Sequence, residues 1–88
     1  MDFENIDCKS LICWLKSQPT DFIEKMLRKT KLPLDLENII ICRCIKQYSF
    51  IKTGDVLRIS EKQQKLRIRK IKEKINNFLT KNVKFKGI

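Results

Sequence analysis

The chain has 88 residues, enough for one domain with a modest core, and it contains no histidine and only two glycines. We therefore expect a small helical bundle that is not an enzyme and binds no cofactor, because the commonest general base and any glycine-rich phosphate loop are missing. The longest apolar run, residues 39–42, is too short to cross a bilayer, and residues 1–4 are unlike a signal peptide. We therefore expect a soluble cytoplasmic protein without a membrane partner. The net charge of the chain is +10.

Two short helices are predicted at the start of the chain. Asp7 is placed to cap the first, and residues 17–19 end it, because proline cannot continue a helix. Thr20 or Asp21 starts the second, whose apolar residues follow one amphipathic stripe until residues 31–33 break it. Both belong to an all-α fold, a compact bundle of four to five helices.

A third helix is predicted over residues 36–47, with Asp35 as its cap. Its apolar residues occupy most of the circumference, so we expect it to be packed on several sides at the centre of the bundle.

Four cysteines raise the question of a metal site: Cys8, Cys13, Cys42 and Cys44. Neither pair has the usual ligand spacing, and no histidine is present to complete a mixed site. We therefore expect no metal, and we interpret the cysteines as free thiols that behave as small buried hydrophobic residues.

Residues 48–79 allow two interpretations. Residues 56–59 and 66–69 alternate between apolar and charged, as in a hairpin like the wing of a winged helix. Against a hairpin, Ser60 and Gln63 form a capping-box pattern, and helical intervals separate the apolar residues Ile68, Ile71, Ile75, Phe78 and Leu79. We favour a short helix over residues 49–57, a tight connection at 58–60 and a long helix from Glu61. This is helix-turn-helix spacing, with Gly54 where two helices cross closely.

Positive charge is concentrated in the second half of the chain. Residues 1–40 contain seven acidic and six basic residues, whereas residues 41–88 contain three acidic and fourteen basic ones. This asymmetry suits a polyanion bound by one face, because each neutralised phosphate releases condensed counterions. The alternative is a solvated lysine-rich surface that reflects an AT-rich genome.

Five segments carry a family pattern: 31–41 (KLPLDLENIII), 48–50 (YSF), 55–57 (DVL), 59–61 (ISE) and 67–68 (RI). Together they resemble the fourth region of bacterial RNA polymerase sigma factors, especially the small alternative ones, over about residues 21–79. In that family a leucine-proline segment opens the helix before the motif, and a tyrosine-serine pair leads the first helix of the motif. A leucine-glycine-isoleucine-serine-glutamate run then forms the turn into the recognition helix.

The resemblance implies that the long helix binds double-stranded promoter DNA at the −35 element, and that other surfaces contact the flap of RNA polymerase. If Ile68 faces the core, Glu73 and most of the candidate DNA-binding residues turn outward. Those candidates are Lys62, Gln63, Lys65, Leu66, Arg67, Arg69 and Lys70. We expect Gln63 to bond a base edge and Lys62, Arg69 and Lys70 to hold phosphates, with Lys65 and Arg67 bordering this surface.

Three residues depart from the family pattern. Arg58 stands where the family has glycine, so the turn is either less sharp or strained. Gln64 replaces a valine on the buried side, while Leu66 is apolar on the exposed side. An exposed leucine can touch a thymine methyl group or dock on another protein.

The resemblance divides the chain into an N-terminal helical extension (1–19), a sigma region 4-like domain (20–80) and a basic C-terminal tail (81–88). Complete sigma factors have a further region that melts the −10 element, and nothing here supplies it. We therefore expect an excised domain, half of a split factor, or a small regulator of a phage or mobile element, acting in a bacterial cell or phage-infected host. The alternative function is an adaptor or inhibitor that binds RNA polymerase or another protein with little base-specific DNA reading.

Overall fold

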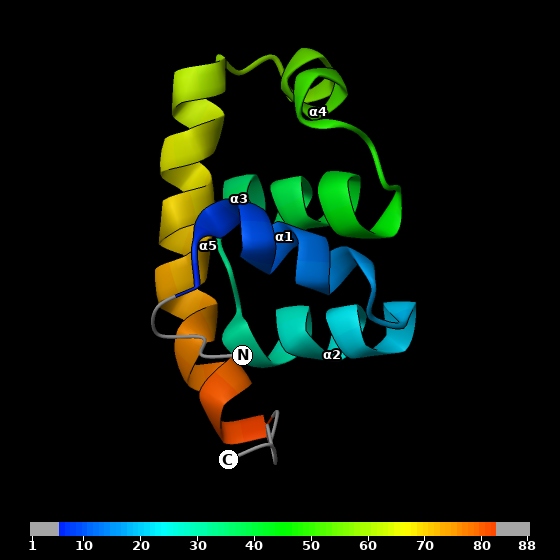
Figure 1. Ribbon diagram of the computed structural model, residues 1–88, viewed down its shortest axis with the longest axis vertical. Coiled ribbons are helices and arrows are strands. Elements are labelled where there is room, and N and C mark those ends of the chain that lie inside the picture. Colours follow the sequence, from blue (N-terminus) through cyan, green and yellow to red (C-terminus); the bar gives the residue numbers. More distant parts are fainter. Residues whose placement is uncertain (1–5, 83–88) are drawn as a thin grey trace.

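The computed structural model describes residues 6–82 of the chain (Figure 1). This part folds into five α-helices joined by short connections, and one of the helices is extended by a π-helical turn. They are α1 (Cys8–Lys16), α2 (Thr20–Thr30), α3 (Leu34–Ile40), the π-turn η1 (Ile41–Ile45), α4 (Phe50–Leu57) and α5 (Glu61–Asn82). Figure 1 shows α5 along one side of the molecule, with α4 beside its first turns and α2 farther toward its end. The all-α bundle is confirmed, and residues 61–82 are helix rather than half of a hairpin.

The first two helices begin and end close to their predicted positions. Asp7 caps α1, because its carboxylate accepts a hydrogen bond of 2.7 Å from the backbone N–H of Ser10, and this bond lowers the pKa of Asp7. Helix α2 starts at Thr20, directly after Pro19. It ends at Lys31, whose φ of 49° lies in the left-handed region and turns the chain toward α3.

The predicted cap and bounds of the third helix were wrong. Pro33 occupies the cap position and α3 starts at Leu34, so Asp35 lies inside the first turn. This placement is favourable because proline's fixed φ suits a helix start and a carboxylate in the first turn opposes the helix dipole.

The same helix also ends differently from the prediction. The N–H of Lys46 donates to the carbonyl of Ile41 at 2.9 Å, a bond that widens the last turn into a π-turn. Gln47 then has a φ of 59°, and the N–H of Tyr48 closes the helix end on the carbonyl of Cys42. The helix therefore stops at Ile45 instead of residue 47.

One continuous core joins the helices. Helix α1 contributes Leu11, Ile12 and Leu15, and α5 contributes its whole predicted stripe, so residues 8–16 pack within the bundle. Because α5 continues to Asn82, the predicted domain boundary at residue 80 falls inside a helix, and most of the predicted tail lies outside the described residues. Among the described helices, none is both long and apolar enough to span a membrane.

The cysteines are free, and two of them are core residues. Cys42 and Cys44 are buried, whereas Cys13 is exposed, so treating every cysteine as a buried hydrophobic residue was wrong for Cys13. Burial raises the pKa of the Cys44 thiol to about 12.

Candidate nucleic-acid interface

Helices α4 and α5 meet through a short turn. The Ser49 hydroxyl caps α4 by accepting from the N–H of Lys52 at 3.0 Å. At the other end, Arg58 takes the left-handed conformation, with a φ of 58°, and the N–H of Ile59 donates to the carbonyl of Gly54 at 3.0 Å. A Cβ on Gly54 would lie 3.1 Å from the carbonyl oxygen of Ile59, so the close approach at Gly54 is to the connection after α4 and not to a crossing helix. Arg58 therefore adopts the conformation that glycine takes at lower cost.

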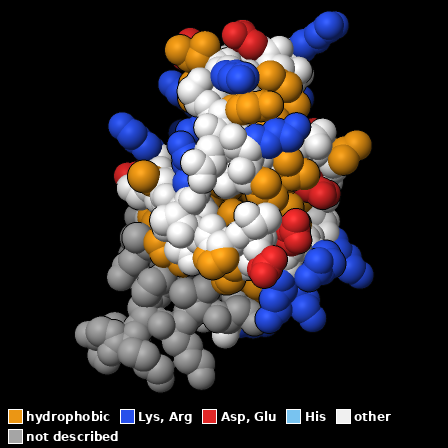
Figure 2. Space-filling model, turned by 90° about the vertical axis from the view of Figure 1, so that its right-hand side faces the viewer, with side chains coloured by type: hydrophobic (Ala, Val, Ile, Leu, Met, Phe, Trp, Pro, Cys, Tyr) orange, Lys and Arg blue, Asp and Glu red, His pale blue; other side chains and the backbone are white. Residues whose placement is uncertain are grey.

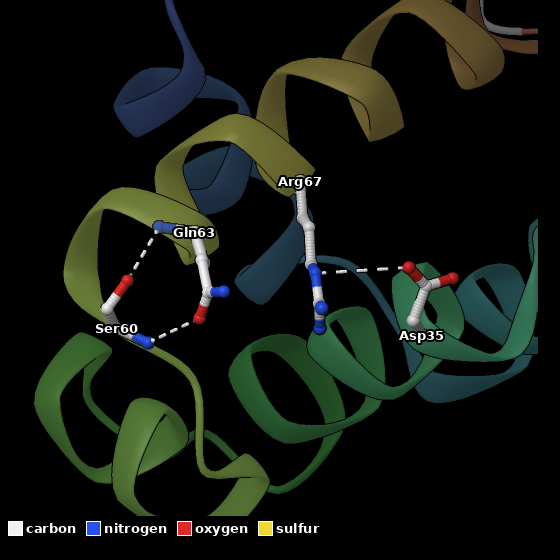
Figure 3. Close-up of polar contacts among 4 residues, drawn as sticks. All are labelled: Asp35, Ser60, Gln63 and Arg67. Carbon is white, nitrogen blue, oxygen red and sulfur yellow. Dashed lines mark hydrogen bonds and ion pairs between the residues drawn. The ribbon is translucent and has the colours of Figure 1, made fainter.

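A reciprocal pair of hydrogen bonds starts α5 (Figure 3). The N–H of Gln63 donates to the Ser60 hydroxyl at 3.1 Å, and the N–H of Ser60 donates to the side-chain oxygen of Gln63 at 3.0 Å. This is the capping box that the sequence predicted. It also occupies the side-chain acceptor of Gln63, the residue we expect to read a base edge.

Gln64, in the first turn of α5, is fully buried. Its Nε2 donates to the carbonyl of Phe50 at 3.0 Å, and its Oε1 accepts from Nη1 of Arg43 at 3.4 Å. The guanidinium of Arg43 also lies 5.6 Å from the centroid of the Phe50 ring. Gln64 therefore links α5 to both α4 and η1, and burial lowers the pKa of Arg43 below its ordinary value, although an arginine remains charged.

The outward face of α5 contains six of the seven candidate DNA-binding residues. Lys62, Gln63, Lys65, Leu66, Arg69 and Lys70 are all exposed. From residue 62 to residue 70 the helix axis rises about 12 Å, comparable with the width of the major groove. The structure thus brings these six side chains together on one helix surface, and their contact with DNA stays a prediction.

Arg67 is the exception. It is half-buried and points toward the first turn of α3, where its Nε lies 3.9 Å from Oδ2 of Asp35 (Figure 3). Both side chains reach solvent, so the pair is worth less than about 1 kcal/mol. Arg67 is therefore better placed to tie α5 to α3 than to reach a base.

A groove of about 910 Å³ borders this face on the side of α1. Its lining residues are Asp7, Cys8, Lys9 and Ile12 of the α1 region, Arg43 of η1, Phe50 of α4, and Lys65, Ile68, Arg69, Lys72, Glu73 and Asn76 of α5. Two buried polar atoms there, Nε of Arg43 and Oδ1 of Asn76, have no hydrogen-bond partner within residues 6–82.

Three basic residues of this groove were missed by the sequence interpretation: Lys9, Arg43 and Lys72. Lys72 was detectable, because residues 65, 69, 72 and 76 follow helical spacing along one side of α5. Lys9 and Arg43 were not, because they join the groove only through the packing of α1 and the π-turn against α5.

Exposed apolar side chains accompany the basic ones. Ile51 and Val56 on α4 are 70% and 49% exposed, and Leu66 on α5 is 47% exposed. Figure 2 shows the face turned away from α5, where hydrophobic side chains gather among lysines and arginines.

In residues 6–82, no three His, Cys, Asp or Glu side chains lie close enough together to hold a metal ion.

The chain matches no known protein family, no curated protein and no solved structure.

Proposed function

We propose that the chain is a DNA-binding transcription regulator that works like an isolated fourth region of a sigma factor, contacting promoter DNA and RNA polymerase. The observation that carries the proposal is the exposed face of α5, the second helix of the predicted helix-turn-helix, which presents Lys62, Lys65, Arg69 and Lys70. A helix of this kind fits the major groove, where base edges present distinct donors and acceptors.

Each side chain has a role that follows from its position. The four cations neutralise phosphates, which supplies affinity and register without reading sequence. Gln63 keeps its side-chain amide as a donor toward a base while its oxygen stays in the capping box. Leu66, which is 47% exposed, contacts a thymine methyl group.

The test is duplex binding at two salt concentrations with charge-matched variants. Changing Lys62, Arg69 and Lys70 to alanine removes three charges from the face. When the logarithm of the binding constant is plotted against the logarithm of the salt concentration, we expect the magnitude of the slope to fall by about three. The control changes two exposed lysines and one exposed arginine of α2, Lys25, Lys29 and Arg28, to alanine, with the same loss of charge. Equal losses in the two triple variants, or binding that does not depend on salt, would show that α5 is not the DNA-binding element.

A second candidate function is an adaptor or inhibitor that binds RNA polymerase with little reading of DNA. The exposed Leu66 in the middle of the basic face favours it, because an apolar residue there also suits a protein contact. The Leu66→Lys variant separates the two functions. If Leu66 is a polymerase contact, the added cation should preserve or strengthen DNA binding while recovery of core polymerase falls. Weakened DNA binding with unchanged polymerase recovery would instead support the thymine contact and count against this second function.

A further inference from the structure

The groove between α1 and α5 combines an apolar floor with a cationic rim. Ile12, Phe50 and Ile68 contribute apolar surface to it. The cations around it are Lys9, Arg43, Lys65, Arg69 and Lys72, against the two carboxylates of Asp7 and Glu73. Because five cations face two carboxylates, the charge around the groove is predominantly positive.

Arg43 is the feature that most strongly indicates an anionic ligand. Arg43 lines the groove, and its guanidinium makes one long hydrogen bond, to the Gln64 oxygen at 3.4 Å, and lies over the Phe50 ring, while its buried Nε has no hydrogen-bond partner in residues 6–82. The one ion pair found in the described part of the chain, Arg67 with Asp35, does not involve Arg43. A guanidinium offers five donors arranged to match a carboxylate, so this side chain is poised to bond one.

The size of the groove limits what fits in it. From residue 65 to residue 76 the axis of α5 rises about 16 Å, which equals roughly three turns of helix. The volume of about 910 Å³ holds a few anchoring side chains but not a whole domain. A short helix laid beside α1 and α5 would meet them as another member of the bundle.

We propose that this groove docks an acidic amphipathic helix of a partner protein, with apolar side chains on the floor and carboxylates on Arg43 and the surrounding lysines. The apolar floor favours a protein over a DNA duplex, because a duplex presents phosphates and gains nothing from apolar surface. Recognition of this type lays the apolar face of a helix into a groove.

Lys65 and Arg69 belong both to this groove and to the candidate DNA-binding face. The docked helix therefore competes with DNA for two cations. This competition rests on the proposed function, whereas docking itself does not require the protein to bind DNA.

The experiment measures binding of a labelled peptide of about three helical turns, with glutamates on one face and leucines on the other. A peptide with glutamine in place of glutamate is its control. We expect Arg43→Met to weaken binding by about tenfold or more, because it removes a charge-assisted bond while keeping the apolar stem. The double variant Lys9→Ser/Lys72→Ser leaves Arg43 in place and should weaken binding by roughly two- to thirtyfold.

The matched control is Lys62→Ser/Lys70→Ser, which removes the same charge from residues of α5 that do not line the groove. It should leave peptide binding within about twofold of the unchanged protein, a difference of only ~0.4 kcal/mol. The proposal is overturned if the glutamine peptide binds equally well or if the two double variants behave alike. It is also overturned if the peptide does not bind the protein and the groove variants instead abolish self-association or binding of single-stranded DNA. Failure of duplex binding with intact peptide binding would refute the proposed function and leave the docking site standing.

Discussion

The Ser60–Gln63 capping box allows the stability of α5 to be separated from its proposed contact with DNA. Glutamate is as good a partner as glutamine in this box, so Gln63→Glu should keep the 3.0 Å bond to the N–H of Ser60. A negative charge in the first turn also opposes the helix dipole, which adds about 0.3–1 kcal/mol to the free energy of unfolding. By contrast, Gln63→Ala removes an exposed hydrogen bond and should lower that free energy by about 0.5–1 kcal/mol.

The effect on DNA binding should have the opposite sign. A carboxylate about 7 Å from a phosphate is repelled by about 0.6 kcal/mol in water, and two or three phosphates lie within that reach on a duplex. Two or three such repulsions sum to about 1.2–1.8 kcal/mol, and salt roughly halves this, so Gln63→Glu should weaken duplex binding by about three- to fivefold.

Urea unfolding followed by circular dichroism, together with fluorescence anisotropy on a labelled duplex, measures both effects in the same protein. Gln63→Ala is the control, since it loses the cap without gaining a charge. Destabilisation of the glutamate variant by about 1 kcal/mol would contradict the capping argument. Unchanged DNA affinity would remove Gln63 from the interface.

Further predictions concern two buried side chains, the turn before α5 and the exposed Asp7 cap. Gln64→Met should cost about 0.5–2 kcal/mol in urea unfolding, because two hydrogen bonds are lost from a fully buried side chain while apolar burial returns part of the cost. Arg58→Gly should leave the free energy of unfolding unchanged or raise it by up to about 1 kcal/mol, whereas Arg58→Val should lower it by ~1–2 kcal/mol, because a φ of 58° suits glycine and penalises a β-branched residue. The Asp7 pKa lies below its ordinary value of 3.8, so its contribution to stability is present above that pH and is lost as the pH falls through the lowered pKa, and Asp7→Asn should remove this dependence. Burial raises the pKa of the Cys44 thiol from 9.0 to about 12, so the contribution of this thiol to stability is present below pH 9.0 and is lost as the pH rises toward 12. Thiol reagents should label the exposed Cys13 well before Cys44.

Opposite outcomes would contradict each argument. If Gln64→Met leaves the free energy of unfolding unchanged, the hydrogen bonds to Phe50 and Arg43 contribute nothing net to stability. If Arg58→Val does not lower the free energy of unfolding, the turn takes another conformation. Retained acid sensitivity in Asp7→Asn would place the titrating group elsewhere. Labelling of Cys44 as fast as Cys13 would show that the packing around η1 opens readily.

The helices with regular apolar spacing were predictable from the sequence. The stripe from Ile68 to Leu79 repeats at three- and four-residue intervals, which only a helix buries on one side. Ser60 and Gln63 also marked the start of α5 correctly, because a capping box depends on local spacing alone. These features need no knowledge of the neighbouring helices.

The central helix was less predictable because its sequence contains little information about phase. Residues 36–45 are apolar on nearly all sides, so no stripe marks where a regular helix gives way to a π-turn. The start was misplaced for a different reason, since Asp35 and Pro33 are both suitable near a helix start and local preference alone does not rank them. The groove was missed for a third reason, because Lys9 and Arg43 join the residues of α5 only through packing.

Arg43 connects these points, because the π-turn that the sequence did not predict places this guanidinium in the groove. Within the described part of the chain its polar contact is one long hydrogen bond to Gln64, which does not fully replace the water that Nε has lost. Replacing Arg43 by methionine would relieve this desolvation but leave the oxygen of the fully buried Gln64 without its partner. A carboxylate docked in the groove would accept from the guanidinium of Arg43, which lines the groove, although the buried Nε itself is out of its reach. Arg43→Met should therefore weaken binding of the acidic ligand and also lower the free energy of unfolding by about 1–3 kcal/mol, because Gln64 is fully buried.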